Sequence, residues 1–139
     1  MSLQKIEVTK EFLSSVESLF SYLSEHENLA ILFAPAKVTR VRDGHDSRNG
    51  VGSVRQVKIP LAPVIEETVT AFKPGELVEY RISNHTPLKN HRGVMLFSPT
   101  ATGSRLHYTI TFESRIPFSG PLVKAVLETV IRNGLKDIR

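Results

Sequence analysis

The sequence predicts an α+β domain in which a curved, seven-stranded antiparallel sheet wraps around one long C-terminal helix. Four stretches between Ile65 and Glu113 alternate apolar and polar residues with period two, which is the pattern of half-buried strands. The C-terminal segment instead repeats apolar residues at helical spacing, so one face of this helix must be covered. The concave side of the sheet is the only large apolar surface that could cover it.

The N-terminal part predicts a strand followed by two short helices. Residues Leu3–Val8 alternate weakly and indicate the opening strand. A capping box that begins at Ser14 precedes an apolar stripe, and a second one that begins at Ser24 precedes a shorter stripe. Pro35 ends the second helix, because a residue before proline is disfavoured in the helical region.

The middle of the chain predicts an antiparallel meander. Its connections are short and rich in turn residues, such as Asp43-Gly44, Pro74-Gly75 and Thr102-Gly103. We expect the strands at Lys37–Arg42, Ser53–Ile59, Ile65–Phe72, Leu77–Ser83, Lys89–Ser98 and Arg105–Arg115. The long helix begins at Ser119-Gly120-Pro121, where proline occupies the first turn and its missing N–H costs no hydrogen bond.

Composition predicts one globular domain spanning residues 1–139. Apolar residues make up 40% and charged residues 23%, and the chain has no cysteine, which excludes disulfides and thiolate sites. No apolar run approaches the roughly 18 residues of a membrane-spanning helix, and the first ten residues lack an apolar signal core. We therefore expect a cytoplasmic protein. The net charge of +4 is spread along the chain, which argues against a nucleic-acid-binding surface.

Polar residues occupy the inward parity of four predicted strands. These residues are Glu67, Tyr80, His91 and Tyr108. Burying so many polar groups is unfavourable unless they find partners, or unless the interior holds a ligand. The sequence therefore predicts a hollow, ligand-holding domain.

Arg55 shares its parity with Val57 and Ile59 and is expected inside the sheet as well. Its guanidinium could meet a carboxylate or carbonyl of a ligand, or form a structural salt bridge with Glu67. The sequence favours the salt bridge slightly and leaves both interpretations open.

Three residues are candidates for catalysis. His91 could transfer a proton, because the ordinary pKa of histidine is roughly 6.5, and Tyr80 could polarise a ligand carbonyl beside it. Glu67 could act as a general acid or base if its pKa were raised by burial. Each of the three could instead be a hydrogen-bonded core residue. Glu66 and Glu67 point to opposite faces of a strand, so they cannot act as a carboxylate pair.

We expect neither a metal nor a cofactor. A metal site would need three converging ligands, and the candidates are His85, His91 and His107. His107 has outward parity and His85 lies at a strand end. The glycines of Gly50-Val51-Gly52 lead into a strand, unlike those of a dinucleotide-binding motif.

Five stretches in this order resemble the polyketide cyclase/dehydrase branch of the START and birch-pollen-allergen (SRPBCC) superfamily, which has the helix-grip fold. They are VESLFSYLSEHENLAILF (Val16–Phe33), GVGSVRQV (Gly50–Val57), EETVTAFKPGELVEY (Glu66–Tyr80), HRGVMLFSP (His91–Pro99) and GSRLHYTITF (Gly103–Phe112). The resemblance covers nearly the whole chain. It implies binding of a hydrophobic molecule, such as a lipid, sterol, polyketide, hormone or quinone, between sheet and long helix, and only some relatives are enzymes.

The resemblance also bears on single positions. Pro60-Leu61-Ala62-Pro63 occupies the place of a loop that closes over the ligand in the hormone-receptor branch, and His91 stands where an aromatic residue is common. We expect the ligand to contact Phe33, Arg55, Val57, Ile59, Glu67, Val69, Tyr80, His91, Met95, Phe97, Tyr108, Ile110, Val126 and Val130.

Three functions are compatible with these features. The first is a carrier or sensor of an apolar small molecule. The second is a cyclase, dehydratase or isomerase that uses His91 with Tyr80, Tyr108 or Glu67. The third is a protein-interaction module, as in toxin–antitoxin or ubiquinone-chaperone relatives. The sequence leaves a homodimer open and indicates neither a nucleic-acid partner nor a transmembrane segment.

Overall fold

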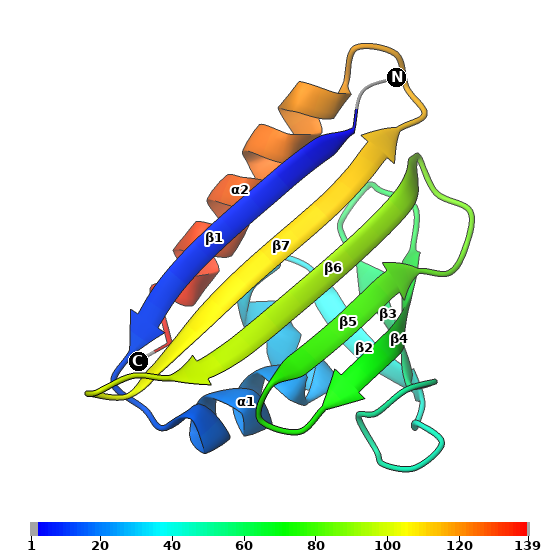
Figure 1. Cartoon of the computed structure of the whole chain (residues 1–139). Coiled ribbons are helices and arrows are strands. Elements are labelled where there is room, and N and C mark those ends of the chain that lie inside the picture. The colour runs from blue at the N-terminus through cyan, green and yellow to red at the C-terminus, as the bar shows by residue number, and fades with distance from the viewer. Residues whose placement is uncertain (1–2, 139) are drawn as a thin grey trace.

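The computed structural model of the chain describes residues 3–138 and shows one seven-stranded sheet with helices on one side (Figure 1). The sheet order is β1-β7-β6-β5-β4-β3-β2 and all its pairings are antiparallel. The elements are β1 (Gln4–Phe12), α1 (Val16–Ser24), the 3₁₀-helix η1 (His26–Ile31), β2 (Lys37–Arg42), β3 (Val54–Lys58), β4 (Ile65–Lys73), β5 (Leu77–Ile82), β6 (Leu88–Pro99), β7 (Ser104–Ser114) and α2 (Gly120–Leu135).

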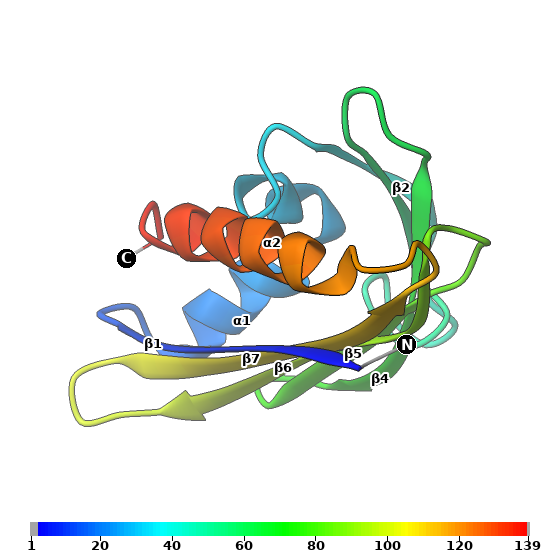
Figure 2. The ribbon, with the colours of Figure 1, turned by 90° about the horizontal axis from the view of Figure 1, so that it is seen from above.

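The sheet is strongly curved and holds α1, η1 and α2 on its concave side. Figure 2 shows it turning from the flat region of β1, β7 and β6 to an upright β2. Three register shifts accompany the curvature, between Arg40 and Arg42, between Val69 and Ala71, and between Lys89 and Arg92. Bulges of this kind bend a strand and increase its twist. The fold class predicted from the sequence, a helix-grip fold, is confirmed.

The concave face carries the core. Alternate residues of β7 are almost completely buried, as the period-two pattern predicts, and α1 covers them with Leu19 and Leu23. At the C-terminal end of α2, Ile131 and Leu135 join this core. A Cβ on Gly134 would lie 2.3 Å from the carbonyl oxygen of Ile31, so α2 packs closely against η1 here.

The N-terminal half of α2 is much less covered. Leu122 is 67% exposed and Val126 is 56% exposed, while Val123 and Leu127 are only partly buried. The long helix is therefore fixed mainly through its C-terminal end. Its other half presents apolar side chains that the protein itself does not bury.

The predicted elements all exist, with shifts at their ends. The opening strand runs on to Phe12, since β1 pairs with β7 along its whole length. The N-cap of α1 is Ser15 rather than the predicted Ser14, because the Ser15 side chain accepts a hydrogen bond of 3.1 Å from the Ser18 N–H. The second helix is 3₁₀, and its N-cap is Glu25, without the side-chain cap predicted at Ser24. No helix within residues 3–138 is long and apolar enough to cross a membrane.

Candidate functional site

A cluster of polar side chains lies on the concave face of β3 to β7. Its five predicted members, Arg55, Glu67, Tyr80, His91 and Tyr108, are between 1% and 8% exposed. The β3–β4 register places Arg55 directly opposite Glu67. All five side chains therefore point inward, as their parity predicts, and sheet pairing brings them together from strands far apart in the sequence.

Arg55 and Glu67 form a buried ion pair. The distance from Arg55 Nε to Glu67 Oε1 is 2.7 Å, and the two side chains are 2% and 9% exposed. The guanidinium carbon also lies 4.5 Å from the ring centroid of Tyr80, a cation–π contact. The structural salt bridge considered for Arg55 is thus present.

One nitrogen of the Arg55 guanidinium has no partner. Arg55 Nη2 is buried without a hydrogen bond, one of two such side-chain atoms in the described part of the chain, the other being Thr100 Oγ1. An unsatisfied buried donor costs about 1–3 kcal/mol, and more on a charged group. The free Nη2 is therefore a buried donor that an acceptor from outside the chain could satisfy.

His26, from η1, completes the cluster and was not predicted. It is fully buried, and its Nε2 lies 2.9 Å from Ser53 Oγ. The Ser53 hydroxyl donates to the Gly50 carbonyl oxygen, so it accepts from His26, and His26 Nδ1 is left to accept a bond of 3.2 Å from Arg55 Nη1. Burial, and then the positive charge of Arg55, lowers the pKa of His26 to about 3.

His26 escaped prediction for a simple reason. It lies in a short helix, where no strand parity indicates the side-chain direction, and its partners Ser53 and Arg55 are distant in the sequence. The only local signal is the spacing of three residues to the buried Leu29. That spacing alone does not separate a buried histidine from an exposed one.

Tyr80 and Tyr108 hydrogen-bond to each other through their hydroxyl groups. Burial raises the pKa of both phenols, so both stay protonated at neutral pH. The Tyr80 ring lies over Gly93 on β6, where an added Cβ would come within 2.3 Å of its Cζ. Gly93 is thus a glycine because the ring needs that space. The pair can donate one hydroxyl proton beyond its own bond.

His91 contacts the ring of Tyr80, and the centroids of the two rings are 5.5 Å apart. Its Nδ1 accepts a hydrogen bond of 3.2 Å from the backbone N–H of Ile82. The neutral ring therefore carries its proton on Nε2, which has no partner among the described residues. Burial lowers the pKa of His91 against the opposing effect of Glu67, so the ring is neutral at pH 7.

The apolar residues expected on the pocket wall fall into three groups by their burial. Those on the strands are buried on the inner face, namely Val57, Val69, Met95, Phe97 and Ile110. Phe33 and Val130 are partly buried. Ile59 is 39% exposed, since it follows the last residue of β3 and strand parity no longer applies, and Val126 is exposed on the uncovered half of α2.

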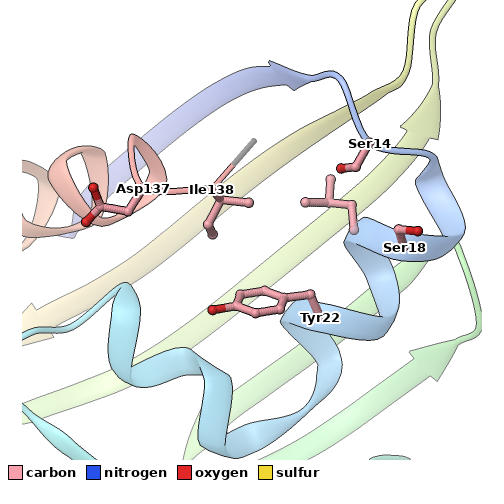
Figure 3. A pocket seen from close by; sticks show the side chains of 6 residues that line it. Ser14, Ser18, Tyr22, Asp137 and Ile138 are labelled. Atoms are coloured by element: carbon pink, nitrogen blue, oxygen red, sulfur yellow. The ribbon is translucent and has the colours of Figure 1, made fainter.

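A separate surface pocket of about 290 Å³ lies away from this cluster. Figure 3 shows Ser18 and Tyr22 of α1 facing Ile138, which follows the C-terminal end of α2. Its lining residues are Ser14, Ser18, Leu19, Tyr22, Asp137 and Ile138, and none of them was predicted as a site residue.

The histidines do not gather into a metal site. His107 faces outward, bonding to Thr9 Oγ1 at 2.8 Å, and His85 is exposed. Within residues 3–138 no group of three His, Cys, Asp or Glu side chains could hold a metal ion.

Sequence comparison assigns the chain to a family. Residues 4–139 match the family described as polyketide cyclase/dehydrase and lipid transport. The chain belongs to this family. Its place in the START and birch-pollen-allergen-like superfamily, indicated by the sequence motifs, is thereby confirmed. None of the curated proteins compared matches the sequence significantly.

Solved structures agree with the family's fold. ZhuI aromatase/cyclase from Streptomyces sp. R1128 superposes with a TM-score of 0.70 at 18% identity, covering 99% of this chain and 90% of that one. Truncated norcoclaurine synthase from Thalictrum flavum gives 0.72 at 12% identity, with 98% and 92% covered. Ara h 8.0201 gives 0.68 at 15% identity, with 98% and 97% covered. At such identities the similarity establishes the fold alone.

Proposed function

We propose that this protein binds a hydrophobic small molecule between the concave face of the sheet and α2, as a carrier or sensor. One observation carries the proposal: a buried guanidinium nitrogen, Arg55 Nη2, has no partner, although the other two nitrogens of the same group are bonded to Glu67 and His26. The partly exposed apolar side chains of the N-terminal half of α2 support it. A ligand with an apolar body and a polar group would satisfy both.

Exposed apolar residues lie at the end of the sheet where β7 ends and α2 begins. In this proposal they border the entrance through which the ligand reaches the polar cluster. Antiparallel register places the start of β4 and the end of β7 at this end, together with the loops that precede and follow them. Leu61 and Phe118, in these two loops, are fully exposed and have φ values of 65° and 66°. Non-glycine residues adopt this left-handed conformation at a cost, which suggests that their exposure serves entry or release of the ligand.

Binding fits the cluster better than proton transfer does. His91 Nδ1 is already engaged by a backbone N–H, so the ring cannot take up a proton there without losing that bond. Burial keeps the Tyr80 phenol protonated, and Glu67 is held in its ion pair. A cyclase or dehydratase is the second candidate, because the unpaired Arg55 nitrogen could also polarise a substrate carbonyl.

Ligand capture tests the proposal. Native mass spectrometry of the protein purified from cell extract, with a thermal-shift screen of apolar compounds, should show a bound small molecule and a raised Tm. Leu127→Asp places a charge on the partly buried inner face of α2 and should abolish the shift. Tyr22→Ala, which alters only the pocket beside α1, should leave it unchanged. Absence of any bound compound, or loss of binding only in the Tyr22 variant, would overturn the proposed site.

A further inference from the structure

We infer that the ligand's polar end is an uncharged oxygen acceptor, such as a ketone or ester carbonyl, and that this site rejects carboxylates. The inference rests on the proposed function and specifies its ligand. It follows from counting the hydrogen-bonding groups of the cluster that remain unpaired and from adding up its charges.

The unpaired nitrogens of the cluster are donors. They are Arg55 Nη2 and His91 Nε2, and the Tyr80–Tyr108 pair has one further hydroxyl proton to give. Arg55 and His91 both adjoin the ring of Tyr80, at 4.5 Å and 5.5 Å from its centroid. A ligand that reaches this point meets N–H groups, so it must present an acceptor.

The guanidinium of Arg55 is partly occupied by bonds within the protein. Two parallel N–H donors are needed for the bidentate contact that makes arginine a strong carboxylate receptor. Here Nε is bonded to Glu67 at 2.7 Å and Nη1 to His26 at 3.2 Å. Both protons of Nη2 and the second proton of Nη1 remain, and a single carbonyl oxygen is enough to satisfy Nη2. The exclusion of a carboxylate therefore rests on the charge of the cluster.

The charge of the cluster disfavours a carboxylate. The Glu67 carboxylate neutralises Arg55, and its second oxygen has no hydrogen-bond partner in the described residues. His26 and His91 are neutral and the two tyrosines protonated at pH 7. A ligand carboxylate would therefore lose its hydration, gain no net positive charge, and face the unpaired oxygen of Glu67. An uncharged carbonyl avoids all three penalties.

A matched set of ligands tests the inference. Lauric acid, methyl laurate, and the methyl ketone and alkane of the same chain length are titrated against the wild-type protein at mildly alkaline pH, by displacement of a fluorescent apolar probe. We expect the ester and ketone to bind at least about tenfold more tightly than the ionised acid, and more tightly than the alkane. In Glu67→Gln the cluster gains a net positive charge, so the acid should gain at least about tenfold relative to the ester.

Glu79→Gln is the matched control. Glu79 also pairs with an arginine, with its Oε2 2.7 Å from Arg92 Nη2, but on the outer face of the sheet. This variant should keep the wild-type ratio of ester to acid. If the wild type binds the acid as tightly as the ester, or more tightly, the inference is overturned while the proposed function stands. This ratio of ester to acid affinity in the wild type decides the inference even if Glu67→Gln does not fold. An unchanged ratio of ester to acid affinity in a folded Glu67→Gln variant would also overturn the inference. Failure of all four compounds to bind would overturn both the inference and the proposed function.

Discussion

Replacing Arg55 by methionine tests whether the buried ion pair is as isolated from water as its geometry indicates. The side chains of Arg55 and Glu67 are 2% and 9% exposed, so the substitution leaves a carboxylate that water hardly reaches. Removing one partner of such a pair costs about 3–5 kcal/mol. Native proteins are stable by about 5–15 kcal/mol in total, so this loss is a large fraction.

The double substitution Arg55→Met with Glu67→Leu should recover most of this loss. Both charges are then absent, and an apolar pair of similar volume is often as stable as a buried ion pair. The difference between the double variant and the sum of the single variants measures the coupling of the two side chains. If each single variant loses about 3–5 kcal/mol and the double variant about 1 kcal/mol, the coupling is at least about 5 kcal/mol.

Urea unfolding followed by far-UV circular dichroism measures these values, provided that the slope m is the same in all variants. The matching decrease in Tm for Arg55→Met is about 10–15 °C. Arg92→Met is the control, because Arg92 is 51% exposed in its pair with Glu79 and should cost less than about 1 kcal/mol. Equal losses in the two variants, or additive single effects in the double variant, would refute the reasoning.

Three further changes probe other parts of the site. Gly93→Ala should lower the free energy of unfolding in urea by about 1–3 kcal/mol, because the new Cβ would collide with the Tyr80 ring. His26 has a pKa of about 3 in the fold against an ordinary value of 6.5, so the unfolded chain binds its proton first. As the pH drops below 6.5, His26 should therefore lower the free energy of unfolding by about 1.4 kcal/mol per pH unit. In His26→Gln the free energy of unfolding should fall less steeply with decreasing pH. Leu61→Ser with Phe118→Ser should change the free energy of unfolding by less than about 0.5 kcal/mol, yet slow ligand uptake in stopped-flow fluorescence.

A specific result would contradict each of these three predictions. Unchanged stability of Gly93→Ala would mean that the ring does not lie over β6. An equal acid slope in His26→Gln would mean that His26 is protonated in the fold. Uptake at the wild-type rate in the double loop variant would separate Leu61 and Phe118 from ligand entry.

The period-two pattern was sufficient to predict the sheet and the direction of its side chains. Glu67, Tyr80 and Tyr108 lie inside as predicted, because a strand alternates its side chains between two faces whatever the neighbouring strands are. Helix ends were predicted less well. Ser14 and Ser15 are both capping residues by composition, and only the backbone geometry selected Ser15.

The partners within the cluster needed the three-dimensional structure. Strand parity showed that Arg55 and Glu67 could meet, and the β3–β4 register placed them opposite each other. Nothing in the sequence placed His26 beside Arg55, since a 3₁₀-helix of six residues has only two turns, too few to establish which of its faces is buried.

The sequence by itself thus determined the strands, the long helix and the inward polar residues, because these depend on local periodicity. Tertiary structure decided which nitrogens of the cluster stay unpaired and how much of α2 the sheet covers. Both depend on the curvature of the sheet and on the packing of η1 against Gly134, which are contacts between segments far apart in the chain.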